Sequence, residues 1–202
     1  MKSLLCIGCT ALMLAILIGC GGGGRQVTRL DAESVTDLSG SWNDTDARLV
    51  AEEMIKDCLS RPWLTEFTTR YDRKPVLTVG TIRNMTSEHI NTLTFTTDFE
   101  RELINSRVVR FVSSREERPE VREERQEQQE FASRETMKRL REELGADFIL
   151  LGTVKEIVDQ VEGKKVVFFQ TDLELINIES NEKVWIGTKK IKKGISQGKV
   201  DW

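Results

Sequence analysis

Apolar residues recur at spacings of three and four over residues 47–59, a pattern that predicts an amphipathic helix. The members of this stripe are Ala47, Val50, Ala51, Met54, Ile55, Cys58 and Leu59. Asn43 or Asp44 can accept hydrogen bonds from the free amides of the first turn, and Asp46 places negative charge near the positive end of the helix dipole. We therefore expect the folded domain to open with a helix soon after Ser41.

Two further helices are predicted from the same kind of pattern. Pro62 ends the first helix, and three apolar residues after it predict a short second one: Trp63, Leu64 and Phe67. A polar loop follows over residues 84–92. Residues 97–100 then open a third helix with its own apolar positions, namely Phe99, Leu103 and Ile104.

Strands are predicted at residues 76–82, 108–112, 146–158, 166–178 and 184–186. The 76–82 segment and the Phe148–Leu151 run are apolar at successive positions, so we expect both to be central and covered on each face. Within 166–178 the apolar phase changes after Leu175, which indicates a bulge. Helices, two strands separated by a helix, and a three-stranded meander predict an α+β fold, a mixed β-sheet of about five strands with helices packed on it.

A charge-dense segment over residues 115–130 contains a single apolar side chain, Val121. It cannot bury a face, so it is either a solvated helix held by ion pairs or a mobile loop. Eight positive and ten negative residues between 115 and 145 nearly balance, which argues against capture of a polyion. The apolar period resumes at four positions after this segment, and Gly145 is placed to end the helix. Those positions are Phe131, Met137, Leu140 and Leu144.

An apolar stretch over residues 4–18 follows a lysine and closes in Leu17-Ile18-Gly19-Cys20. This order is typical of a secretory signal, and its end resembles a bacterial lipobox. The stretch is shorter than the ~20 residues that span a bilayer. We therefore expect residues 1–19 to be a signal peptide and Cys20 to be lipidated. Gly21, where an aspartate would favour inner-membrane retention in bacterial lipoproteins, implies an outer-membrane anchor facing the periplasm.

Residues 20–40 are polar and glycine-rich, which predicts a flexible tether before a globular domain at 41–202. Fully extended, that tether reaches at most ~70 Å. The formal net charge is −3, so nothing indicates a nucleic-acid partner. Cys58 is the only cysteine of the domain, and its place on the apolar helix face favours burial over reactivity.

Residues with catalytic or ligand-binding chemistry are few. His89 is the only histidine, and we interpret it as a solvated loop residue. Asp44 and Asp46 fit helix capping better than cation binding, and Trp42 and Trp185 fit hydrophobic anchoring better than sugar stacking. No serine-hydrolase, phosphate-loop or Cys-x-x-Cys motif occurs. We expect neither an enzyme nor a site for a metal, cofactor or small-molecule substrate.

Four segments of the chain resemble the LpoB family of penicillin-binding-protein activators. The most specific is Leu38–Met54, LSGSWNDTDARLVAEEM, and the others are Val79–Asn84, Gln128–Ser133 and Gly145–Gly152. The resemblance as a whole extends over roughly residues 38–194. The resemblance implies a fold similar to the N-terminal domain of TolB. It also implies an outer-membrane lipoprotein that binds a bifunctional class A penicillin-binding protein and stimulates peptidoglycan synthesis.

Two other functions stay open at this point. An envelope assembly or secretion accessory lipoprotein, similar to CsgG, would act by oligomerisation, which sizing in detergent would reveal. A cell-wall hydrolase would need a carboxylate pair or a metal cluster, and no candidate spacing is present. The short glycine-rich tether departs from the long proline-rich one of better-known family members, so the partner must protrude toward the outer membrane or be another envelope protein.

The charge-dense segment has two interpretations. It is either a solvated face or the surface that contacts the partner. In the second case, four arginines would form charge-assisted hydrogen bonds with carboxylates of the periplasmic partner. These candidate partner-binding residues are Arg115, Arg118, Arg122 and Arg125. The lysines at 189, 190, 192 and 193 fit protection of a sheet edge against strand addition.

Overall fold

The computed structural model describes residues 27–32, 34–136, 138 and 143–196. The chain divides into two compact units, Met1–Ser34 and Val35–Trp202. In the described part of the first unit, the carbonyl of Asp31 accepts hydrogen bonds from the amide and the hydroxyl of Ser34, at 3.1 and 2.6 Å. The predicted signal segment and Cys20 lie outside the described residues. The second unit starts at Val35, ahead of the domain start predicted at Ser41.

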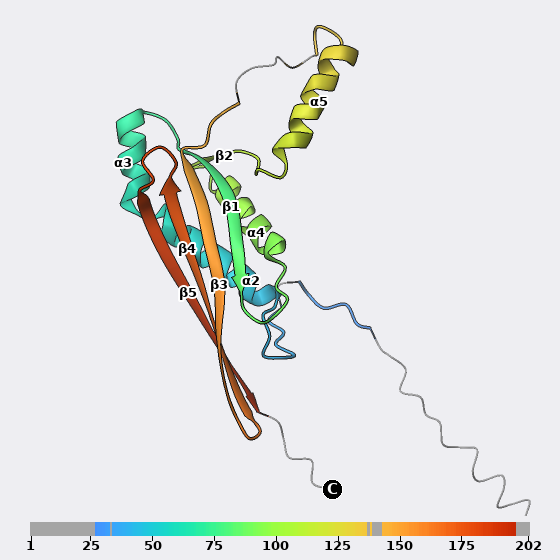
Figure 1. The fold of residues 1–202 in the computed structure, drawn as a ribbon, viewed down its shortest axis with the longest axis vertical. Helices are drawn as coiled ribbons and strands as arrows, with labels where there is room; N and C mark the ends of the chain where they lie inside the picture. The colour runs from blue at the N-terminus through green and yellow to red at the C-terminus, as the bar shows by residue number, and fades with distance from the viewer. Residues whose placement is uncertain (1–26, 33, 137, 139–142, 197–202) are drawn as a thin grey trace, which may run out of the picture. The chain divides into compact units, whose positions relative to one another are not determined.

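Five strands form one mixed sheet with the order β2-β1-β3-β4-β5 (Figure 1). Their bounds are β1 Val76–Met85, β2 Arg110–Phe111, β3 Phe148–Val161, β4 Lys164–Asn177 and β5 Lys183–Ser196. Strand β1 is parallel to β2 and β3, whereas β4 is antiparallel to both of its neighbours. The predicted α+β class, with a mixed sheet of five strands, is confirmed. A register shift is present between Leu175 and Ile176, but the extra residue is Val184 of β5, so the bulge predicted within β4 lies on the neighbouring strand instead.

Helix α2 (Asp44–Leu59) begins with a reciprocal capping box. The side chain of Asn43 accepts a hydrogen bond from the amide of Asp46, and the carboxylate of Asp46 accepts one from the amide of Asn43, each at 3.0 Å. A cap of this kind contributes about 1 kcal/mol of stability. The predicted stripe is buried from Ala47 to Cys58, so the first helix and its core face are confirmed.

Helix α3 (Pro62–Tyr71) carries its proline in the first turn, where the missing amide hydrogen costs nothing. Trp63 and Phe67 pack edge-on against Phe148 of β3, with ring centroids 5.1 and 5.3 Å away. The short second helix is therefore present as predicted, and its aromatic side chains fix it to the end of the sheet.

Helix α4 (Thr92–Ser106) starts earlier than the predicted opening at Thr97. The side chain of Asn91 caps it by accepting a hydrogen bond from the amide of Leu93 at 3.1 Å. Phe95, Phe99 and Leu103 are buried. Ile104, predicted as a core residue, is 53% exposed, because the buried positions recur every four residues at Phe95, Phe99 and Leu103 and Ile104 lies beside that row.

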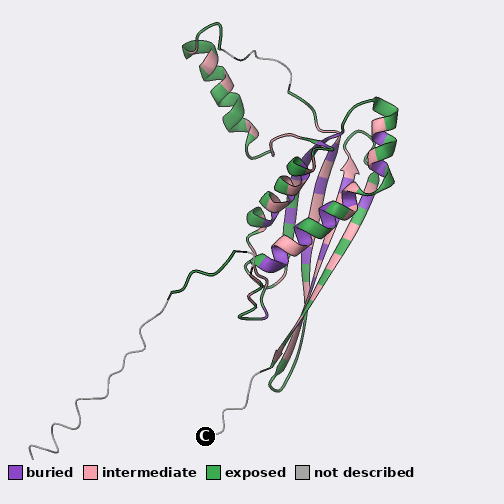
Figure 2. Ribbon diagram, turned by 180° about the vertical axis from the view of Figure 1, so that it is seen from behind, coloured by how far each residue is buried: buried purple, intermediate pink, exposed green. Residues whose placement is uncertain are grey.

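The helices α2, α3 and α4 lie on one face of the sheet (Figure 2). Alternate strand residues such as Leu150 and Leu173 point into this layer and are fully buried. On the other face, Ile149 and Leu151 are only half-buried, and only the first four residues of β1 are buried at every position. The prediction that both runs are covered on each face is wrong, because no described helix packs on the second face.

Helix α5 (Arg118–Phe131) is the charge-dense segment, and none of its residues is buried. The segment was predicted to be either a solvated helix or a mobile loop, and from Arg118 onward it is a solvated helix. A helix with buried apolar residues was predicted to continue beyond this segment, and for the described residues this is wrong. Positions 132–136 are not helical, Phe131 is 78% exposed and Leu144 is 43% exposed. Met137 and Leu140 lie outside the described residues.

Candidate partner-binding surface

No described residues form a group of three or more histidine, cysteine, aspartate or glutamate side chains that could hold a metal ion. His89 is exposed in the loop before α4. Cys58 is 1% exposed, and burial raises the pKa of its thiol to about 12, which keeps it in the unreactive thiol form. Of the helices in the described ranges, none is both long and apolar enough to cross a membrane.

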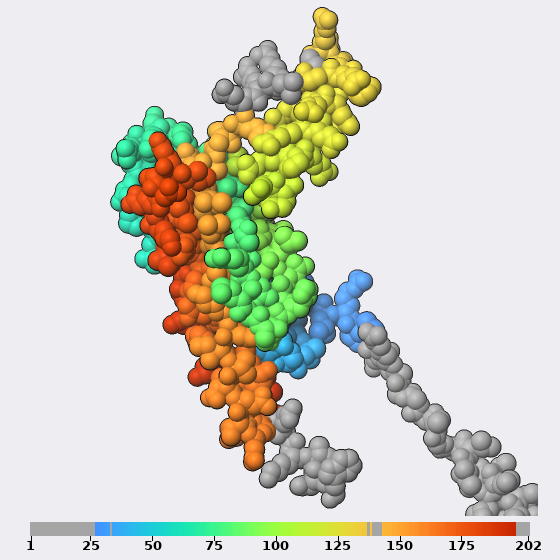
Figure 3. Space-filling view, in the orientation of Figure 1, coloured from blue at the N-terminus to red at the C-terminus, as the bar shows by residue number. Residues whose placement is uncertain are grey.

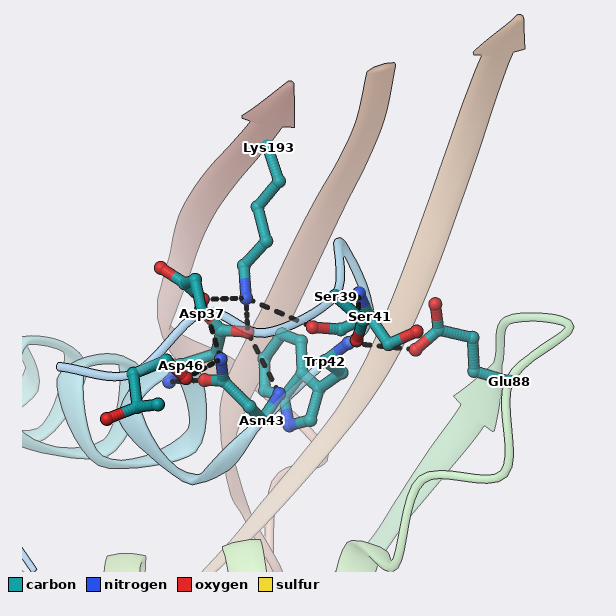
Figure 4. Close-up of polar contacts among 9 residues, drawn as sticks. Asp37, Ser39, Ser41, Trp42, Asn43, Asp46, Glu88 and Lys193 are labelled. Atoms are coloured by element: carbon teal, nitrogen blue, oxygen red, sulfur yellow. Dashed lines mark hydrogen bonds and ion pairs between the residues drawn. The ribbon is translucent and has the colours of Figure 1, made fainter. Parts of the chain in front are cut away.

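Residues 38–54, which carry the most specific resemblance, make contacts that hold the start of α2 against β5 (Figure 4). Lys193 of β5 reaches into it and bonds to Asp46 at 2.6 Å, to Asp37 at 2.7 Å and to the carbonyl of Ser41 at 3.0 Å. Burial by itself lowers the pKa of Lys193, but the hydrogen bonds to Asp37 and Asp46 outweigh it and raise that pKa above 10.5. Asp46 therefore serves the helix start, and Asp44 adds negative charge to the same first turn.

Hydrophobic contacts complete this attachment. Trp42 packs edge-on against Phe95 and Phe169, with ring centroids 5.8 and 5.5 Å away. Gly40 is buried, and a side chain there would meet Ile195 of β5 at 2.1 Å. Trp185 likewise packs into the core, and its indole donates a hydrogen bond to Asp57 at 2.9 Å. Both tryptophans are hydrophobic anchors, in agreement with the sequence interpretation.

The four predicted arginines differ in how far they are bonded to other residues of the chain. Arg122 forms two hydrogen bonds of 2.8 Å with Glu143, and Arg125 lies 3.7 Å from the same carboxylate. The Arg122 hydrogen bond, with smaller contributions from its charge and from Arg125 and Arg118, outweighs burial and lowers the pKa of Glu143. Two of the arginines are thus already engaged within the chain.

The other two arginines stand at the start of the segment. Arg118 is half-buried, and its Nε donates a hydrogen bond to the carbonyl of Ser114 at 3.2 Å. Arg115 lies in the turn before α5, is exposed, and makes no hydrogen bond or ion pair with the described residues. Arg115 is therefore the arginine whose guanidinium is most available to a partner.

A cavity of about 390 Å³ lies where the start of α5 meets the end of the sheet. Arg118, Arg125 and Val121 line it from the helix, and Thr78 and Phe111 line it from β1 and β2. The sequence did not predict this cavity, because its walls come from segments far apart in the chain. It places the charged helix next to the β1 side of the sheet.

The open face of the sheet carries a second polar cluster that sequence reasoning missed. Asp172 of β4 accepts hydrogen bonds from Thr188 at 2.7 Å, from Gln170 at 2.9 Å and from Lys155 at 3.0 Å. Burial alone would raise the pKa of Asp172, but these three donors together lower it. The available signal was the alternation of polar residues in 152–156 and 170–174, which is typical of a half-exposed face.

The profile of one protein family, described as "Peptidoglycan-synthase activator LpoB", matches residues 46–191. The chain belongs to the LpoB family. This match spans well over half of the chain. It includes most of α2, the helices α3, α4 and α5, and the sheet as far as the middle of β5. Membership confirms the predicted resemblance and makes the chain a member of a family of activators rather than of enzymes.

Solved structures of similar proteins include the C-terminal domain of LpoB from Escherichia coli, at 17% identity and a TM-score of 0.42, covering 72% of this chain and 98% of that one. Lipoprotein GNA1162 from Neisseria meningitidis is 14% identical with a TM-score of 0.38, covering 62% and 88%. A PelC dodecamer from Paraburkholderia phytofirmans is 19% identical with a TM-score of 0.33, covering 59% and 72%. Among curated proteins, no sequence matches this chain. The LpoB assignment rests on the family match.

Proposed function

We propose that this LpoB-family chain binds a class A penicillin-binding protein and stimulates its synthesis of peptidoglycan. The observation that carries the proposal is the family match over residues 46–191. The exposed α5 and the free guanidinium of Arg115 support it, since a charged helix with no buried residue is suited to contact another protein. The family match favours this function over an assembly accessory that acts by oligomerisation.

The proposal includes an outer-membrane anchor at Cys20, with the domain facing the periplasm. If the chain is cleaved there, the predicted tether runs from Cys20 to residue 40. Fully extended, such a tether reaches at most ~70 Å. The synthase would therefore have to extend a periplasmic domain toward the outer membrane to meet this activator.

The anchor is tested by fractionation. Cys20→Ser should abolish acylation and leave an uncleaved or released form, whereas the unchanged chain should co-sediment with the outer membrane in a sucrose gradient. A mature chain that sediments with the inner membrane would contradict the sorting half of the proposal.

The activator function is tested with a purified class A synthase, by measuring glycan polymerisation with and without the mature chain. The double variant Arg115→Glu, Arg118→Glu should slow association, leave the melting temperature nearly unchanged and make the residual binding less sensitive to salt. The matched control is Lys190→Glu, Lys192→Glu, which makes the same charge change on exposed residues of β5. If the unchanged chain neither binds nor accelerates the synthase, the proposed function is wrong.

If the arginine double variant and the lysine double variant both bind the synthase as strongly as the unchanged chain does, the start of α5 is not part of the contact. The function would then stand, and the contact surface would have to lie on another part of the domain.

A further inference from the structure

The outer edge of β1 is almost unpaired. Strand β2 covers it only at Val76 and Leu77, which pair with Arg110 and Phe111. From Thr78 to Met85, no strand of the described residues pairs with this side of β1. Exposed edges usually carry charges, prolines or covering elements that prevent strand addition. Gly80, Thr81 and Ile82 supply no charge at the centre of this edge.

A groove of about 520 Å³ runs along this free edge. One wall is β1 from Val79 to Ile82, and the opposite wall is the start of α4, with Thr92, Thr96 and Glu100. The Ser114–Arg118 turn borders it toward α5, and Figure 3 shows the green surface of β1 and α4 next to the yellow surface of α5. A groove between a strand edge and a helix has the form that accepts an added strand.

The floor of the groove is apolar because of Gly80. A side chain at this position would lie 2.6 Å from Leu151 Cδ2 and 2.8 Å from Ile149 Cδ1. Without one, these two β3 side chains lean across β1, and both line the groove. Thr78 also lines it, and its buried hydroxyl has no hydrogen-bond partner among the described residues. The groove therefore offers apolar surface to an occupant.

The charge of the groove favours a cation. Glu100 is half-buried and makes no hydrogen bond or ion pair with the described residues. Burial, and then the nearby carboxylate of Glu117, raise the pKa of Glu100. The two arginines at this end do not neutralise Glu100: Arg118 is turned to the carbonyl of Ser114, and Arg115 is exposed at the rim. An unpaired carboxylate of this kind is stabilised by an incoming lysine or arginine.

We propose that the free edge of β1 binds an extended segment of the synthase by strand addition, with a lysine or arginine of that segment against Glu100. This inference rests on the proposed function. The stretch from Val79 to Ile82 fits about four added residues, or ~13 Å of strand. A second copy of this chain is a poorer occupant, since pairing through the same edge would bring two Glu100–Glu117 carboxylate pairs to one interface.

The test measures binding of the mature chain, purified in detergent, to a purified class A synthase. Thr81→Lys places a charge on the edge, as sheets do to block strand addition, and should weaken binding at least tenfold. Glu100→Gln keeps the shape but removes the charge, and should weaken binding about fivefold without lowering the melting temperature. The control is Thr65→Lys, at an exposed threonine of α3, which should bind as the unchanged chain does.

A photo-crosslinker at position 81 identifies the occupant directly. A covalent adduct with the synthase is the expected result, whereas an adduct with a second copy alone would overturn the proposal. Full-strength binding by both groove variants would also overturn it and leave the proposed function standing. Failure of the unchanged chain to bind the synthase would instead remove both.

Discussion

The two edges of the sheet differ in almost every respect. Strand β5 is fourteen residues long and carries lysines at 189, 190, 192 and 193. Strand β1 is covered by a partner of two residues and then borders a groove to which its own residues, Val79 to Ile82, bring no charge. The β5 lysines fit protection against strand addition, whereas this part of the β1 edge has no such charges, and its only irregularity is the register shift with β3 between Val79 and Ile82. The comparison indicates that one edge is closed to partners and the other is available.

The lysines of β5 divide further into two rows. Lys189 and Lys193 point toward the helices and pair with Glu53 and Asp46. Lys190 and Lys192 point to the open face, are exposed, and have no ion pair with the described residues. The first row ties the strand to the helix layer, and the second leaves its charge in solvent. Strand β1 has no counterpart to either row between Gly80 and Ile82.

The largest expected effect comes from the core behind β1. Phe99 of α4 is fully buried and packs against Phe95 with ring centroids 4.4 Å apart. Phe99→Ala should therefore destabilise the domain by about 3–5 kcal/mol, from lost burial and an internal cavity. Chemical denaturation measures this free energy. Phe131→Ala, at an exposed position of α5, is the control and should change it by less than about 0.5 kcal/mol.

The inner lysine row gives the next largest effect. Asp46 is 4% exposed, so Lys193→Ala would leave a buried carboxylate without its cation. We expect a loss of about 2–3 kcal/mol in the free energy of unfolding. Lys192→Ala removes the neighbouring charge from the outer row and should change stability by less than about 0.5 kcal/mol. Equal losses for the two variants would contradict the division into rows.

A smaller, pH-dependent effect is expected where β1 and β3 begin. Burial alone would raise the pKa of Asp147, but its hydrogen bonds to Arg73 and to the amide of Val76 lower it below 3.8. A depressed pKa contributes stability above pH 3.8 that is lost as the pH falls through the folded-state value. Asp147→Asn should cost about 1 kcal/mol at pH 7, and the difference should shrink below pH 4. A difference independent of pH in thermal melts would contradict this account.

The outer lysine row should have the smallest effect on stability and a distinct effect on association. Lys190→Thr combined with Lys192→Thr removes two unpaired charges and leaves good strand-forming residues. The melting temperature should stay nearly constant, while analytical ultracentrifugation should detect larger species that increase with concentration. If the variant associates no more than the unchanged chain, the outer lysines do not protect the β5 edge.

Local patterns in the sequence predicted much of the fold. The stripe from Ala47 to Cys58 and the Asn43–Asp46 pair identified α2 and its cap, because both signals lie within a few residues. The open second face was missed because continuous apolar runs look alike whether one face or both are covered. Ile149 and Leu151 were read as buried for this reason.

The candidate site was harder to predict, because distant segments of the chain build it. The groove combines residues 78–82, 92–100 and 114–118, and it exists because β2 is only two residues long. Nothing in the local sequence separates Glu100 from an ordinary exposed helix carboxylate. The pairing of Arg122 with Glu143 joins residues 21 apart, across a stretch that was predicted to continue as a helix. The four arginines remain predictions as partner contacts.

Hydrogen exchange of the mature chain, with and without a class A synthase, tests most directly whether this activator contacts its partner through the β1 edge. The account predicts slower exchange of the amides from Thr78 to Met85 when the synthase is bound, with no change from Lys183 to Ser196. Slower exchange along β5 with β1 unaffected, or no change anywhere in the domain, would contradict it.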